Sequence, residues 1–227
     1  MQGPTHLMVS WYFAEASDAA TPRDRRVVAW AGFMPDVDVL AYLGALVYYR
    51  FDKELAFENV WKEVHHRYTH NLAFVLVTGV VAYWLASAGD ARHKVRVAAL
   101  AMAACALHDF LDVVGAGPTW PIYPQWPFSG DGWYAAWSWT IGDWQNIVIF
   151  VALIVGMFAY AKMRGRSPIE CFGNRADAWF TRIVREGSDS RAGQVRPTSR
   201  WLRWIIWGVL ALGVVAVLAP LGFNPFG

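Results

Sequence analysis

Residues 95–115 have the sequence VRVAALAMAACALHDFLDVVG, a largely apolar run. It is long enough to cross a bilayer, because a spanning helix needs about 20 mostly apolar residues. It also carries His108, Asp109 and Asp112 inside the apolar run. An ionisable side chain near the bilayer centre costs about 2.5–3.5 kcal/mol on insertion scales, so such residues usually have a function. The stretch therefore predicts a membrane helix that contributes to a functional site.

The composition of the whole chain agrees with a membrane protein. Of its 227 residues 56% are hydrophobic and 14 are Trp, and the mean hydropathy is +0.25. A soluble domain is usually about 45–50% apolar. The net charge of +2 is too small to indicate a nucleic-acid partner. Cys105 and Cys171 have no CxxC partner, so no disulfide framework is expected.

Four further segments are apolar over about the length of a span, and with residues 95–115 they predict an all-α integral membrane protein with about five transmembrane helices. The four segments are Val27–Tyr49, Leu72–Ala88, Trp144–Lys162 and Leu202–Leu221. The segment His6–Ala16 is apolar but too short to cross, which indicates an N-terminal half-helix. The segment Phe51–Val64 has apolar residues along one helical face, which is typical of a helix lying in the interface.

The distribution of Lys and Arg predicts the orientation of these spans. Most of the 20 basic residues fall in residues 23–26, 92–96 and 162–203, whereas residues 116–143 contain none. Basic loops stay in the cytoplasm, so five alternating spans would place all three basic loops inside and the Trp-rich loop outside. We therefore expect three parts: a membrane domain with the metal site (1–162), an Arg-rich cytoplasmic segment that contacts anionic headgroups (163–200), and a C-terminal transmembrane anchor (201–227).

Histidine and aspartate recur at a spacing of four residues. His66 and His70 open the second predicted span, and His108 and Asp112 lie inside the third. Residues four apart share one face of a helix. Two such faces can close around a divalent ion such as Zn²⁺, whose bonds to nitrogen and oxygen are about 2.0–2.2 Å long. These four residues therefore predict a metal site.

The remaining predicted ligands come from the N-terminal part of the chain. Asp36 and Asp38 interrupt the first predicted span and can bridge two ions or orient a ligand histidine. Counted from the cytoplasmic loops at about 1.5 Å per residue, His6, Asp36 and His108 fall at similar heights, toward the outer half of the bilayer. The predicted metal ligands are thus His6, Asp36, Asp38, His66, His70, His108 and Asp112.

Three residues are predicted to take part in catalysis. Asp38 can act as a general base, and Asp109, about 100° around the helix from His108, can orient a ligand or contact a neighbouring helix. Arg67 can extend to the interface or hold a phosphate. Of the other histidines, His65 is interpreted as interfacial and His93 as solvated in a basic loop.

The motifs resemble those of a known family. Thr5-His6, the sequence GFMPDVD at 32–38, HRYTH at 66–70 and HDFLD at 108–112, followed by a Gly/Pro-rich loop, are similar to the bacterial inner-membrane, LexA-regulated, metal-dependent hydrolase family. The chain departs from that pattern at Asn71, where such proteins often have Ser, and it lacks a Thr soon after Asp112. The types of ligand also resemble, more loosely, the site of the all-helical zinc-dependent phospholipase C.

These resemblances imply a multi-pass protein of the bacterial inner membrane that holds one to three divalent ions, with zinc preferred. They imply hydrolysis, by metal-activated water, of a phosphoester or other lipid-borne substrate. The aromatic loop Trp120–Trp139 suits the headgroup region and can cap the site, which favours a lipid substrate. The expected partners are membrane lipids and a small-molecule or lipid substrate.

Other classes of protein remain as alternatives. A metal-ion transporter, or a metal-binding membrane protein without hydrolytic activity, would also place His and Asp in spans. A haem or quinone protein can use facing histidines, although the Asp partners argue against bis-His haem. A lipid phosphatase of the vanadium-haloperoxidase type needs Ser-Gly-His, and a serine hydrolase needs G-x-S-x-G; the sequence contains neither.

Overall fold

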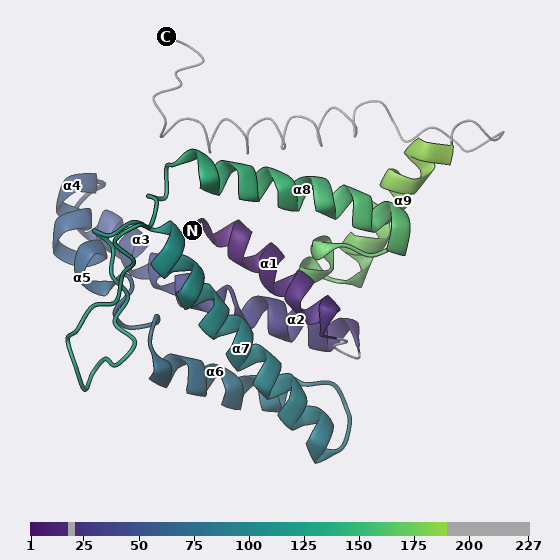
Figure 1. Cartoon of the computed structure of the whole chain (residues 1–227), viewed down its shortest axis with the longest axis horizontal. Coiled ribbons are helices and arrows are strands. Elements are labelled where there is room, and N and C mark those ends of the chain that lie inside the picture. The colour runs from purple at the N-terminus through teal and green to yellow at the C-terminus, as the bar shows by residue number, and fades with distance from the viewer. Residues whose placement is uncertain (18–20, 190–227) are drawn as a thin grey trace, which may run out of the picture. The chain divides into compact units, whose positions relative to one another are not determined.

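The structure is a computed structural model that describes all residues except 18–20 and 190–227 (Figure 1). Within the described residues every regular element is a helix, and Ile122 and Trp133 form an isolated antiparallel bridge. The predicted all-α class is therefore confirmed. The chain divides into two compact units, Met1–Ile141 and Gly142–Gly227.

The described residues of the first unit form seven α-helices and two other helical segments. They are α1 (Gly3–Ala16), α2 (Pro22–Ala31), the 3₁₀-helix η1 (Met34–Asp38), α3 (Val39–Tyr48), α4 (Lys53–Ala56), the π-helix η2 (Phe57–Trp61), α5 (Lys62–Val64), α6 (Leu72–Leu85) and α7 (Ala91–Gly115). Helices therefore form over both short segments that the sequence singled out, His6–Ala16 and Phe51–Val64. Their position relative to a bilayer stays a prediction.

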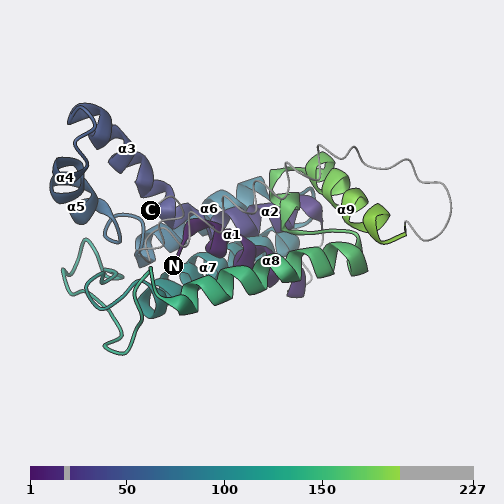
Figure 2. The ribbon, with the colours of Figure 1, turned by 90° about the horizontal axis from the view of Figure 1, so that it is seen from above.

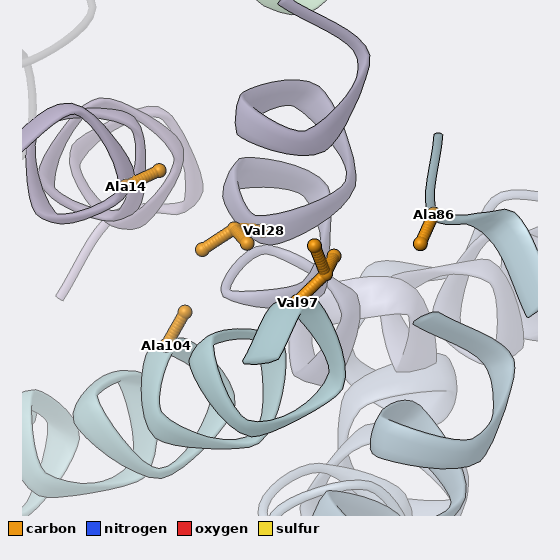
Figure 3. Packing of buried hydrophobic residues seen from close by; sticks show 5 residues of the cluster. All are labelled: Ala14, Val28, Ala86, Val97 and Ala104. Atoms are coloured by element: carbon orange, nitrogen blue, oxygen red, sulfur yellow. The ribbon is translucent and has the colours of Figure 1, made fainter. Parts of the chain in front are cut away.

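Small side chains allow α1, α2, α6 and α7 to pack closely. Figure 3 shows side chains from α1, α2, α7 and the end of α6 meeting in one cluster. Its members are Ala14, Val28, Ala86, Val97 and Ala104. Between α6 and α7, a Cβ atom at Gly79 would lie 2.5 Å from Met102 Cγ. Small residues at such contacts are typical of helices that associate in membranes, where backbones approach closely.

A polar cluster joins the start of α2 to the turn between α6 and α7. Thr21 caps α2 by accepting a hydrogen bond from the Asp24 amide at 3.1 Å. The buried Asp24 carboxylate accepts hydrogen bonds from Thr21 Oγ1 at 2.7 Å and from both the amide and the hydroxyl of Ser87 at 2.8 Å. His93 was expected to be solvated, yet its Nε2 lies 3.0 Å from Ser87 Oγ. This cluster connects the start of α2, the end of α6 and the start of α7.

The predicted count of five spans is not confirmed. In the described residues α7 and α8 (Trp144–Arg164) are long and apolar enough to cross a membrane, and α2 with η1–α3 is a third candidate if taken as one broken span bent by 57°. That bend lies close to Pro35, which removes a backbone donor. α6 has only 14 residues. The fifth predicted span, Leu202–Leu221, lies outside the described residues.

The second unit is built on α8. This helix ends at Gly165, whose φ of 69° is the left-handed conformation that glycine adopts most readily. The 3₁₀-helix η3 (Pro168–Phe172) and α9 (Asn174–Asp189) follow. Figures 1 and 2 show α9 beside the C-terminal end of α8, where Phe180 packs against Met157 and Ala161. Much of the predicted Arg-rich segment is therefore helical and packed.

Candidate metal centre

Four potential ligand atoms meet where η1, the loop before α6, and α7 come together. They belong to Asp36, His70, His108 and Asp112, and they all lie within 4.8 Å of one another. His108 and Asp112 lie one turn apart on α7, as their spacing predicted. Asp36 lies on η1 after the bend, and His70 lies just before α6. Except for Asp36, these side chains are buried.

Four of the six separations between these atoms are close to those expected around a tetrahedral ion. With bonds of about 2.0–2.2 Å, the ligands of such an ion lie roughly 3.3–3.6 Å from one another. His108 Nε2 is 3.1 Å from His70 Nε2, 3.1 Å from Asp112 Oδ2 and 3.7 Å from Asp36 Oδ1. His70 Nε2 is 3.5 Å from Asp112 Oδ2. The four residues therefore fit a divalent ion.

Backbone carbonyls hold two of the imidazoles by the nitrogen that faces away from the site. His108 Nδ1 lies 2.8 Å from the carbonyl oxygen of Gly32, and His66 Nδ1 lies 3.3 Å from that of Trp120. In each ring Nε2 then faces Asp112 Oδ2, at 3.5 Å for His66. An outer partner that fixes the ring in this way is usual for metal-binding histidines.

The structure brings His6 to the same cluster, although it is 106 residues from Asp112 in sequence. His6 Nε2 lies 3.2 Å from Asp112 Oδ1, and the His6 ring stacks on the His108 ring with centroids 3.6 Å apart. The N-terminal amine of Met1 also forms an ion pair with Asp112 Oδ1. His6 and His66 are therefore close enough to complete or extend the ligand set.

Asp38 lies behind the histidines and outside the four-atom group. Its carboxylate is 3.0 Å from His65 Nδ1 and accepts a hydrogen bond from Thr69 Oγ1 at 3.1 Å. Thr69 Oγ1 is in turn 3.2 Å from His70 Nδ1. Asp38 thus contacts His65 directly, and its Oδ2 lies 3.7 Å from His70 Nδ1, with Thr69 Oγ1 bridging the two side chains, which is the position of an orienting residue.

Sequence reasoning missed His65. Its ring stacks on Trp61 at 4.0 Å between centroids and lies 4.0 Å from the His66 ring. His65, His66 and His70 form a second group of potential metal ligands. The signal available in the sequence was the adjacent pair His65-His66, but a helical spacing argument assigns neighbouring residues to different faces.

The prediction that His66 and His70 share one face of a helix is wrong. α5 ends at Val64 and α6 begins at Leu72, because Asn71 caps α6 through a hydrogen bond from the Phe74 amide at 2.9 Å. His66 has a φ of 66°, a left-handed conformation that is uncommon for residues other than glycine. The His66 and His70 rings still come within 4.5 Å, through a loop.

Several buried polar atoms in this region have no hydrogen-bond partner among the described residues. They are His6 Nδ1, Asp36 Oδ2, Asp109 Oδ1 and Asp112 Oδ2. Buried polar groups in proteins are normally paired, so unpaired oxygens and imidazoles beside a tetrahedral set fit a cation. Burial also lowers the pKa of His65 and lowers the pKa of His70 well below its ordinary value. Neutral imidazole is the form that binds metal.

The other two predicted catalytic residues lie outside the four-atom group. Asp109 is buried on α7 next to His108. Arg67 donates a hydrogen bond to Glu63 at 3.0 Å, and its guanidinium lies 4.9 Å from the centre of the Tyr123 ring. Tyr123 belongs to the aromatic loop, whose backbone is joined to the histidine loop by the bond from Tyr123 N to His66 O at 3.2 Å.

Comparison with known proteins supports the membrane assignment. Searches of curated proteins and of solved structures found no match. The family model described as YdjM inner membrane protein matches residues 1–221, which is nearly the whole chain. This agrees with the inner-membrane family that the motifs indicated, whereas LexA regulation and the likeness to phospholipase C stay predictions. The chain belongs to the YdjM inner membrane protein family.

Proposed function

We propose that this protein is a membrane-bound, metal-dependent hydrolase that acts on a phosphoester or other lipid-borne substrate. The observation that carries the proposal is the set of four ligand atoms on Asp36, His70, His108 and Asp112, which lie within 4.8 Å of one another with four separations between 3.1 and 3.7 Å. A buried site with this geometry in an inner-membrane protein points to chemistry at the membrane.

The same residues suggest how many ions are held. Asp36, His70, His108 and Asp112 would hold one divalent ion, zinc by preference for imidazole and carboxylate ligands. His65 and His66 provide a second group with His70, and His6 adds a further imidazole beside Asp112. One to three ions is therefore the proposed range. When bound there, a zinc ion supplies the Lewis acidity that activates water for attack near neutral pH.

The chain's own residues would position the ligands, accept a proton and bind the substrate. Asp38 orients His65 and, through Thr69, His70. Asp109 Oδ1 is buried without a hydrogen-bond partner, so we assign it to accept a proton during hydrolysis. Arg67 follows His66 in the chain and its side chain is 32% exposed; its planar guanidinium is suited to a substrate phosphate.

The aromatic loop supports a lipid-borne substrate. Phe128 is 93% exposed and Trp137 is 72% exposed, while the loop contacts the metal-site histidines through Trp120 and Tyr123. Aromatic side chains are enriched at the level of lipid headgroups. A loop that meets headgroups on one side and the site on the other would admit a substrate from the bilayer.

Elemental analysis combined with a lipid assay tests this proposal. Purified protein is expected to contain a stoichiometric divalent metal and to release headgroup or phosphate from phospholipid vesicles, with activity lost after chelation and restored by zinc. The His70→Ala variant should lose both metal and activity. Bound metal with no release from any phospholipid would overturn the lipid hydrolase. Ion flux into vesicles under those conditions would assign the site to transport instead.

A further inference from the structure

The last described helix folds back along an apolar helix that is long enough to span the membrane. Phe180 of α9 packs against Met157 and Ala161 of α8, and the rings of Phe158 and Phe180 have centroids 5.3 Å apart. Met157 lies seven residues before the end of α8, which is about 10 Å along the helix. If α8 crosses the bilayer with Lys162 and Arg164 at the surface, α9 packs against the part of α8 nearest that surface.

Two contacts hold α9 in this position. Ser167 at the start of η3 donates a hydrogen bond to the buried Asp177 carboxylate at 2.7 Å. Arg185 Nε donates to the carbonyl oxygen of Ala161 at 3.3 Å, close to where α8 ends. A cation at a helix C-terminus also interacts favourably with the helix dipole. α9 is thus held to the start of η3 near its first turn and to α8 near its C-terminal end.

The two faces of α9 differ in chemistry. Asp177, Phe180 and Thr181 are buried on one face. Arg175, Trp179 and Arg182 are exposed and recur at i, i+4 and i+7, so they share one face. The Arg182 side chain is 66% exposed, and its nearest carboxylate, Glu186, is 3.9 Å away, at the limit of an ion pair. We call Arg175, Trp179 and Arg182 the Arg-Trp stripe.

Other exposed residues of the second unit are also cationic or apolar. Lys162 and Arg164 at the end of α8 are exposed, as are the apolar side chains of Met163 and Phe172. The acidic residues Glu170 and Asp177 are instead buried. The exposed surface is therefore cationic and partly apolar, which complements anionic headgroups above acyl chains.

We propose that α9 is an interfacial helix whose Arg-Trp stripe binds anionic phospholipid headgroups. The arginines alone would suit an acidic soluble partner, whereas exposed Trp179 on the same face as Arg175 and Arg182 fits a surface that is both charged and apolar. Trp at the headgroup level and Arg facing anionic lipid are the usual composition of such helices. This binding is independent of the hydrolase proposed above.

Hydrogen exchange of the full-length protein in nanodiscs tests the proposal. One set of nanodiscs contains phosphatidylcholine only, and the other also contains phosphatidylglycerol. Amides of α9 are expected to exchange more slowly in the anionic nanodiscs, and high salt should reverse the effect. Each arginine near an anionic surface strengthens binding about fivefold, so Arg175→Gln with Arg182→Gln should remove most of the added protection.

A matched control removes two other exposed cations, by Lys53→Gln with Arg92→Gln, and should keep the protection of α9. Equal exchange of wild-type α9 in the two lipids would overturn the proposal. So would faster exchange of the Arg175→Gln, Arg182→Gln variant by the same factor in both lipids, since the arginines would then stabilise the helix itself.

Discussion

His108 Nδ1 lies 2.8 Å from the carbonyl oxygen of Gly32, although the two residues are 76 positions apart in the sequence. Gly32 is the C-cap of α2, at the bend that precedes Asp36. The bend therefore does two things: it interrupts an apolar segment, and it presents a carbonyl that turns His108 Nε2 toward Asp112.

Removal of His108 or His70 should abolish tight metal binding. Each imidazole supplies one of the four ligand atoms. Its loss should therefore lower the metal affinity by more than the roughly 10–100-fold that follows loss of an outer contact. Elemental analysis of purified His108→Ala and His70→Ala proteins measures this. His93→Ala, which removes a histidine from the polar cluster at Asp24, should keep its metal. Full metal content in a His70→Ala, His108→Ala double variant would contradict the assignment.

Gly32→Ala should destabilise the first unit and weaken metal binding. The added Cβ would lie 2.6 Å from Ser10 Cβ, closer still to Ser10 Oγ, and 3.1 Å from the Ala104 carbonyl oxygen. Overpacking of this kind costs about 1–3 kcal/mol. Thermal unfolding in detergent would show the loss. Gly44→Ala is the matched control, because nothing lies within 4 Å of its added Cβ; an equal loss there would mean that the close approach at Gly32 is unimportant.

Asp38→Asn should weaken metal binding without abolishing it. Asp38 contacts His65 and Thr69 and is outside the four-atom group, so about a 10–100-fold loss of affinity is expected from an outer residue. Competition with a chelator would measure the affinity. Asp36→Asn, a change at a direct ligand, should have the larger effect. The reverse order would make Asp38 the direct ligand, as the sequence had allowed.

Asp24→Ala should destabilise the helices and leave the metal site intact. The Asp24 carboxylate accepts hydrogen bonds from Thr21 and twice from Ser87, at the start of α2 and the turn before α7. Loss of a charged acceptor costs about 1.5–3 kcal/mol. Thermal unfolding would report this cost, and elemental analysis should find unchanged metal. Asp131→Ala, at an exposed residue of the aromatic loop, should change the melting temperature little.

Local sequence patterns were sufficient to predict the membrane class, the helical architecture and much of the composition of the candidate site. A long apolar run with His108 and Asp112 one helical turn apart required only local periodicity, because α7 is a regular helix over its whole length. The depth in the bilayer that grouped His6 with Asp36 and His108 was likewise calculated from the known rise per residue of a helix.

The contacts among the remaining side chains of the site could not be predicted from local patterns and are seen in the folded chain. His66 and His70 approach through a loop with a left-handed residue, His65 joins them, and Asp38 lies behind the histidines. Likewise, the segment predicted as the first span is bent between α2 and α3. Helical spacing predicts neighbours within one element. Convergence of separate elements depends on bends, loop conformations and hydrogen bonds between distant residues, such as that of His108 with Gly32.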